Sequence, residues 1–228
     1  MTIGIILAME SELAPYLTGK YSIEDKQGKL FYHLKISNKE VILAFSGIGK
    51  VNASYTTSLI IHNYQPDIII STGVSGGLGQ SDLMQFVVAS ATCQHDFDTS
   101  ALGDELGMIG TINVKYFPTD KVISQLFIKD ANAKYGVVAC GDQFICNKEK
   151  AKQISTDFNA IACDMESGAI GQVCYMAKVP YVVVRCISDS ADDNATMDFN
   201  TLVIKASKLL SSKVIETIKT LSIDKLGD

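Results

Sequence analysis

The sequence is poor in the features that mark membrane proteins and nucleic-acid-binding proteins. No apolar run approaches the roughly 20 residues that an α-helix needs to span a bilayer. The 228 residues include no tryptophan and one arginine, and the formal net charge is −5. Because nucleic-acid-binding domains carry clustered basic residues, this charge balance argues against a nucleic-acid partner. We therefore predict a protein that binds neither a membrane nor a nucleic acid.

The positions of the cysteines and histidines also argue against a disulfide framework and a metal site. The six cysteines form no C-x-x-C pair, and several lie inside apolar runs, where cysteine behaves as a small buried hydrophobe. Of the three histidines, His95 lies beside Asp96 but has no further local partner at zinc-ligand spacing. The N-terminal apolar run is short, lacks a basic segment and soon meets Glu10, which is unlike a signal peptide. We expect a reduced, cytoplasmic protein with no metal.

Alternation of strand-like and helix-like segments predicts the fold class. Such alternation favours a mainly parallel sheet between layers of helices. We predict an α/β fold with one domain over residues 1–228, in which a central, mixed, mainly parallel twisted sheet is flanked by helices. Residues 92–118 are expected to form a long irregular and therefore functional loop. The expected strands are 2–8, 21–25, 30–36, 40–45, 68–70, 85–91, 136–139, 160–163 and 180–187, and the expected helices are 10–20, 51–64, 119–131, one starting near 148, 166–177 and 199–221.

Three apolar, strand-like runs end in carboxylates. Residues 3–8 lead to Glu10 and Glu12, residues 160–163 lead to Asp164 and Glu166, and residues 179–187 lead to Asp189. Ligands in open α/β sheets bind outside the carboxyl ends of the strands, so these acids are expected to meet in one site. Each alone is better explained as a helix cap or a first-turn acid, and this holds above all for Glu10. Together they favour acid/base chemistry on a polar, neutral or cationic substrate.

Two glycine-rich segments follow predicted strands. Ser46–Lys50 lacks the P-loop spacing, so it is either an ordinary strand-to-helix turn or a place where backbone approaches a ligand. Thr72–Gly77 has more glycine than a simple turn needs. We expect it to be a loop whose exposed N–H groups form a nest for an anion or a polarised water.

Six segments, in order along the whole chain, resemble those of 5'-methylthioadenosine/S-adenosylhomocysteine nucleosidases in the nucleoside phosphorylase/hydrolase superfamily. The resemblance implies a nucleoside phosphorylase-like fold and a homodimer that hydrolyses the N-glycosidic bond of a 5'-modified adenosine without a cofactor. The segments are Ile5–Glu12, Ser46–Val51, Thr72–Gly77, Gly141–Ile145, Asp164–Glu166 and Arg185–Asp189.

The resemblance also implies roles for the carboxylates. Adenine leaves its ribose through an oxocarbenium-like transition state, which calls for an acid on the base and an activated water at the sugar. Asp189 would protonate adenine N7, with a pKa raised by burial and by neighbouring carboxylates. Glu12 would be the general base for the water, and Glu166 would accept hydrogen bonds from the ribose hydroxyls.

Further residues would hold the substrate and the water by the same resemblance. Arg185 and Ser75 would hold the water, and Ser188 would support Asp189. Phe144 would stack on adenine, and the backbone of Ile145 would read the edge of the base. The residues expected to pack on the sugar or line the pocket are Met165, Met9, Ile48 and Phe199.

The single arginine separates two reactions within the superfamily. Phosphorylases of this superfamily hold phosphate with several arginines, whose guanidinium forks match phosphate oxygens. Arg185 alone favours water as the nucleophile, although lysine also binds phosphate. The alternatives are a purine nucleoside phosphorylase and a nucleoside-binding protein without turnover, and Glu12 and Asp189 argue against the second.

The chain departs from the family pattern in three places. Thr99, Leu102 and Asp104 stand where valine, phenylalanine and tyrosine are frequent, in a region that shapes the 5'-substituent pocket, partly across a dimer. Val74-Ser75 replaces Ser-Ala, and Asp164 replaces glutamate. We expect these changes to alter the preferred 5'-group and to leave the reaction class intact.

Overall fold

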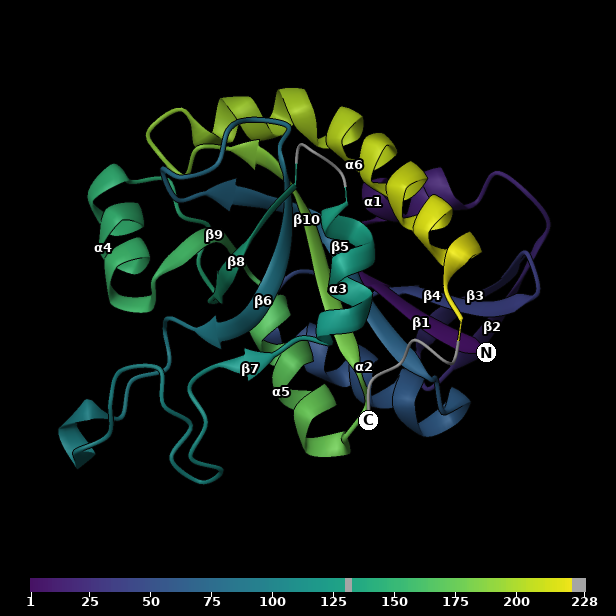
Figure 1. The fold of residues 1–228 in the computed structure, drawn as a ribbon, viewed down its shortest axis with the longest axis horizontal. Helices are drawn as coiled ribbons and strands as arrows, with labels where there is room; N and C mark the ends of the chain where they lie inside the picture. The colour runs from purple at the N-terminus through teal and green to yellow at the C-terminus, as the bar shows by residue number, and fades with distance from the viewer. Residues whose placement is uncertain (130–132, 223–228) are drawn as a thin grey trace.

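The computed structural model describes residues 1–129 and 133–222, which pair into a ten-stranded mixed sheet (Figure 1). The order is β10-β6-β8-β9-β5-β1-β4-β3-β2, with β7 beside β6. The central strands β4, β1, β5 and β10 run parallel, whereas β2, β3 and β4 form an antiparallel meander. The strands are β1 (Thr2–Leu7), β2 (Tyr21–Lys26), β3 (Lys29–Ile36), β4 (Lys39–Phe45), β5 (Ile68–Gly77), β6 (Phe86–Gln94), β7 (Phe117–Pro118), β8 (Ala133–Cys140), β9 (Ala160–Asp164) and β10 (Tyr181–Asp189).

Helices cover both faces of the sheet, which confirms the predicted α/β fold class. On one face, side chains of α1, α3 and α6 share a core with β1, β4 and β10. On the other face, α2 and α5 pack together against the same strands, on the side opposite α6 in Figure 1. The helices are α1 (Glu10–Leu13), α2 (Lys50–Tyr64), α3 (Lys121–Ile128), α4 (Lys148–Phe158), α5 (Ser167–Ala177) and α6 (Ala195–Thr220).

The sheet closes on itself at one end, which the alternation of elements did not predict. β5 pairs with β10 along most of its length and with β9 at Gly76 and Gly77. β10 pairs with β6, β6 with β8, and β8 with β9, so these five strands form a ring. The closure brings the carboxyl ends of β5, β9 and β10 to one place.

The glycine-rich segment after residue 70 is strand and not loop. β5 continues through Gly77, because β10 pairs with it in parallel from Tyr181 to Asp189. The predicted nest of exposed N–H groups is therefore wrong. The glycines allow close approach instead: a Cβ on Gly73 would lie 2.5 Å from Glu12 Oε1.

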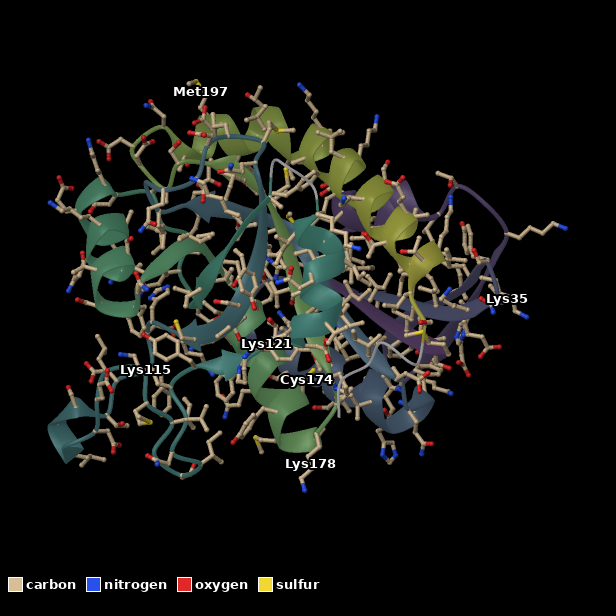
Figure 2. The ribbon with its side chains drawn as sticks, viewed as in Figure 1. Lys35, Lys115, Lys121, Cys174, Lys178 and Met197 are labelled. Carbon is tan, nitrogen blue, oxygen red and sulfur yellow. The ribbon has the colours of Figure 1, made fainter. Side chains whose placement is uncertain are left out.

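Three helices differ in length from the prediction. The helix expected over residues 119–131 is α3, which ends at Ile128, and residues 130 and 131 of that expectation lie outside the described residues. The expected helix over residues 10–20 is only α1 followed by a 3-10 turn at Ala14–Tyr16, which has Pro15 in its first turn. Proline lacks the N–H that a continuing helix would use. α6 begins at Ala195, four residues earlier than expected, and Met197 in its first turn points outward (Figure 2).

The segment expected to be irregular is shorter than residues 92–118. β6 continues to Gln94, and the chain returns to it at β7. Between them, residues 95–116 form a loop that projects from the body, with Lys115 at its base (Figures 1 and 2). Leu102, in a 3-10 turn of this loop, is 83% exposed.

Candidate active site

A pocket opens at the carboxyl ends of β1, β5, β9 and β10. This is the edge at which the three strand-end carboxylates were expected to meet. Eleven of the twelve predicted site residues line it, and Arg185 does not. The eleven are Met9, Glu12, Ile48, Ser75, Phe144, Ile145, Met165, Glu166, Ser188, Asp189 and Phe199.

The Glu12 side chain enters the pocket from α1 and accepts hydrogen bonds from the backbone that follows β1 and from the backbone of β5. Its Oε2 accepts hydrogen bonds from the amides of Ala8 and Met9 at 2.9 and 3.0 Å, as a third-position glutamate does when it caps its own helix. Its Oε1 accepts one from the Val74 amide of β5 at 2.9 Å. Burial raises the pKa of Glu12, although these amides and Arg185 oppose the shift. The carboxylate is therefore fixed in position and made more basic than an exposed one.

Asp189, at the end of β10, is also buried. Its Oδ2 accepts a hydrogen bond from Ser188 Oγ at 2.9 Å, and its Oδ1 accepts one from the Ala191 amide at 3.0 Å. Burial raises its pKa against both hydrogen bonds, and nearby Asp198 and Asp192 add to the rise. Such a carboxyl group retains a proton to higher pH than a free aspartic acid.

Glu166 follows β9 and lies at the start of α5. Its Oε1 accepts a hydrogen bond from the Gly49 amide at 2.8 Å, which connects it to the first turn of α2. Burial and the neighbouring Asp164 raise the pKa of Glu166 to about 8. Its carboxyl group can accept or share protons with a hydroxylated ligand in the pocket.

Arg185 lies beside the main pocket, in a smaller cavity that it shares with Glu12, Glu166 and Ser71. Its Nε donates to Asp164 Oδ2 at 2.8 Å, and a terminal nitrogen donates to Ser71 Oγ at 2.9 Å. The other oxygen of Asp164 accepts hydrogen bonds from the amide and hydroxyl of Ser167 at the start of α5. Asp164 thus joins Arg185 to the helix that follows Glu166.

Apolar side chains enclose the rest of the pocket. The rings of Phe144 and Phe199 meet edge to face, with centroids 5.8 Å apart, although they lie far apart in the chain. Phe144 and Ile48 remain half-exposed at the mouth. Ser75 is buried in the wall, and its Oγ has no hydrogen-bond partner among the described residues. The arrangement suits a flat, largely apolar ligand with a polar centre.

Comparisons with known proteins identify the family. The sequence pattern of the Phosphorylase superfamily matches residues 2–219. The chain is 37% identical to the 5'-methylthioadenosine/S-adenosylhomocysteine nucleosidase of Staphylococcus carnosus, over 96% of this chain and all of that one. It is 36% identical to the Shewanella loihica nucleosidase, over 97% of this chain and all of that one. The chain belongs to the 5'-methylthioadenosine/S-adenosylhomocysteine nucleosidase family.

Solved structures place the chain in the same family. A Helicobacter pylori mutant enzyme with 5'-methylthioadenosine in its active site has a TM-score of 0.93 and 32% identity, over 96% of this chain and 99% of that one. A futalosine hydrolase mutant of the same species is equally similar in fold, with a TM-score of 0.93 and 31% identity, over 97% of this chain and 100% of that one. Proteins with this fold are thus named for two hydrolytic activities.

Several lining residues were not predicted from the sequence. Gly76 and Gln143 lie within motifs that carried the family resemblance, so position within a motif was the available signal. Successive side chains of a strand point to opposite faces, so the expectation of Asp164 at the site gave no reason to expect Cys163, the residue before it in β9. Asp164 was expected here as one of the strand-end acids, and the lining residues that were not predicted are Ala8, Val74, Gly76, Gln143 and Cys163.

Thr99, Leu102 and Asp104 do not line the pocket of this chain. Thr99 Oγ1 donates to Asp104 Oδ2 at 2.8 Å, so two of the three residues stabilise the projecting loop. Their predicted influence on the 5'-group therefore requires contact with a second molecule.

The described part of the chain offers neither a cluster of metal ligands nor a membrane-spanning helix. Within residues 1–129 and 133–222, histidine, cysteine and acidic side chains form no group of three or more able to hold a metal ion. No helix in the described part of the chain has the length and apolar character needed to cross a membrane.

Proposed function

We propose that this protein hydrolyses the N-glycosidic bond of a 5'-modified adenosine, such as 5'-methylthioadenosine or S-adenosylhomocysteine. The products would be adenine and the free ribose derivative. One observation carries the proposal: Glu12, Glu166 and Asp189 reach the same apolar pocket from three different elements. Membership of the nucleosidase family supports it.

Asp189 would be the general acid. Its raised pKa supports a protonated carboxyl group that gives its proton to adenine N7 as the bond from N9 to the anomeric carbon breaks. The electron pair of that bond leaves with the neutral adenine. The Ser188 hydroxyl and the Ala191 amide then stabilise the Asp189 carboxylate that remains.

Glu12 would be the general base. The ribose becomes oxocarbenium-like as adenine leaves, and a water attacks the anomeric carbon. Glu12 removes a proton from that water, so the sugar gains a hydroxyl group. The three amides that hold Glu12 fix the direction in which its carboxylate approaches the water.

Glu166 would bind the ribose hydroxyls, while Phe144 and Phe199 enclose the base. Met165, Met9 and Ile48 would contact the sugar and its 5'-substituent, and the backbone of Ile145 would meet the edge of adenine.

Water is favoured over phosphate as the nucleophile by the charges around the pocket. The described residues that line it include no arginine or lysine. Arg185 lies in the adjoining cavity, where Asp164 already neutralises it. We therefore propose that Arg185 orients the attacking water and the Glu12 region through the smaller cavity.

The projecting loop supports a proposal for the quaternary structure. We propose a cytoplasmic homodimer in which the loop at residues 95–116 meets a second copy, because Leu102 at its end is almost fully exposed. Sedimentation of the wild type and of Leu102→Asp tests this proposal, since the charged variant should shift the population towards monomer. A wild type that sediments as a monomer would refute it.

The experiment that tests the activity is adenine release, followed by chromatography, with and without phosphate. The panel contains 5'-methylthioadenosine, S-adenosylhomocysteine, futalosine, 5'-deoxyadenosine and inosine. Release of adenine and free sugar without phosphate supports the nucleosidase, and release of a free base from futalosine alone would favour the activity named for the H. pylori hydrolase. Strict dependence on phosphate would identify a phosphorylase, and binding without any release would identify a nucleoside-binding protein.

Replacing the proposed acid should abolish turnover. In Asp189→Asn the amide cannot supply the proton, so kcat should fall by at least about 100-fold. Asp193→Asn, an exposed acid in the following turn, is the control and should stay within about twofold of wild type. If Asp189→Asn retains wild-type kcat while folded, another group is the acid.

A further inference from the structure

Three segments that are distant in sequence meet in a hydrogen-bonded ring next to the pocket. The Lys50 amide donates to Asp142 Oδ1 at 2.8 Å, and the Asp142 amide donates to Asp96 Oδ2 at 2.8 Å. The Lys50 ammonium then donates to Asp96 Oδ1 at 2.6 Å, which closes the ring. We call Lys50, Asp96 and Asp142 the Lys50 network.

The Lys50 network is partly sequestered from water. The side chains of Lys50 and Asp96 are 18% and 17% exposed, so their ion pair is less screened than a surface pair. Burial alone would raise the pKa of Asp96, but the Lys50 ammonium and the Asp142 amide hold it below its usual value. The ammonium also donates to Gln94 Oε1 at 3.1 Å, which connects the ring to β6.

Two of the three segments, those of Lys50 and Asp142, continue directly into walls of the pocket. Gly49, next to Lys50, donates its amide to Glu166. Phe144 and Ile145 follow Asp142 after one residue and line the other end. Gly49 also has a φ of 98°, and a Cβ there would lie 3.0 Å from Asp142 Oδ1. The backbone is therefore adapted to bring the two walls together at this point.

None of the three side chains lines the pocket, and none contacts Glu12 or Asp189. We propose that the Lys50 network positions both ends of the nucleoside site: Glu166 at the sugar and the 144–145 segment at the base. Lys50, Asp96 and Asp142 are then positioning residues, and this inference rests on the proposed function.

Steady-state kinetics and adenine binding by calorimetry test the network in purified, full-length protein. In Asp96→Asn only one side-chain oxygen remains, so either the Asp142 N–H or the Lys50 ammonium loses its acceptor, and the ion pair is lost in both orientations. The Kd for adenine and the KM for 5'-methylthioadenosine should each rise by about tenfold, because small displacements of binding groups are costly. The pH limbs of kcat should stay in place, since Glu12 and Asp189 keep their partners.

Lys50 variants provide a second comparison. Lys50→Met should weaken adenine binding as Asp96→Asn does, whereas Lys50→Arg keeps the charge and should remain within about threefold of wild type. Glu24→Gln is the matched control, because Glu24 pairs with Lys26 and His33 in the meander, away from the pocket. It should leave both constants within about twofold of wild type.

The outcomes separate the two proposals. A wild type that releases no adenine refutes the proposed function. If the wild type is active and folded Asp96→Asn binds adenine with unchanged Kd and KM, the positioning role is wrong. The same holds if Asp96→Asn only lowers the unfolding temperature. If Lys50→Met fails to fold, the Asp96→Asn measurement decides alone.

Discussion

At the residue scale, the site depends on carboxyl groups whose protonation is set by burial. Glu12, Glu166 and Asp189 all have raised pKa values, and burial is the largest cause for each. The three carboxyl groups differ in the hydrogen bonds that they accept. Glu12 accepts them from three backbone amides and Glu166 from one, whereas Asp189 accepts one from an amide and one from a hydroxyl group. Acid and base roles can coexist in one pocket because these local donors differ.

Ser188 gives a direct test of the acid. Its hydroxyl donates to Asp189 and stabilises the ionised form, so Ser188→Ala should raise the pKa of Asp189 further. The alkaline limb of kcat/KM, where the acid loses its proton, should move to higher pH by about one unit. The measurement is kcat/KM against pH, with Ser212→Ala on the exposed side of α6 as the control. An unmoved limb would show that Asp189 is not the titrating acid.

At the scale of elements, β5 contributes most to the site. It lies between β1 and β10, and it supplies the Val74 amide to Glu12 and the Ser75 wall of the pocket. Gly73 of this strand is required for steric reasons, because a side chain there would occupy the position of the Glu12 carboxylate. The strand and the helix that carries Glu12 therefore fit only when residue 73 has no Cβ.

Gly73→Ala tests this fit. The added Cβ would lie 2.5 Å from Glu12 Oε1, so the carboxylate must move. We expect kcat to fall by about 100-fold, as displacement of a catalytic group by about 1 Å does. Gly19→Ala, where a Cβ meets nothing within 4 Å, is the matched control and should keep wild-type activity. Comparable kcat values for the two variants would contradict the role assigned to this contact.

At the scale of the whole molecule, the buried acids make stability depend on pH. The folded-state pKa of Glu166 is about 8 and the ordinary value is 4.5, so folding binds a proton between these limits. The contribution of Glu166 is fully present below pH 4.5 and is lost as pH rises through about 8. Raised pKa values of Glu12 and Asp189 act in the same direction.

Glu166→Gln should reduce this dependence. The neutral amide keeps an oxygen for the Gly49 N–H and has no proton to lose. Between pH 4.5 and about 8, the free energy of unfolding of wild type should fall by roughly 1 kcal/mol per pH unit more than that of the variant. Urea denaturation across this range measures the difference, with Glu216→Gln, exposed on α6, as the control. Parallel curves for wild type and Glu166→Gln would contradict the raised pKa.

The sequence by itself determined the fold class, the family and the neighbourhood of the site. Hydrophobic periodicity and carboxylates at strand ends depend only on residues that are close in sequence, so they can be recognised without a structure. Thus the sequence alone marks Glu12, Glu166 and Asp189 as candidate site residues. The roles assigned to them remain predictions until variants are measured.

Tertiary structure decided the rest, because it depends on contacts between distant segments. Pairing with β10 made residues 71–77 strand where their glycines suggested a loop. The ion pair with Asp164 placed Arg185 in the adjoining cavity. The ring of Lys50, Asp96 and Asp142 joins residues 46 and 92 positions apart in sequence. Hydrophobic periodicity cannot predict such contacts, because each depends on how the closed sheet brings separate loops to one edge.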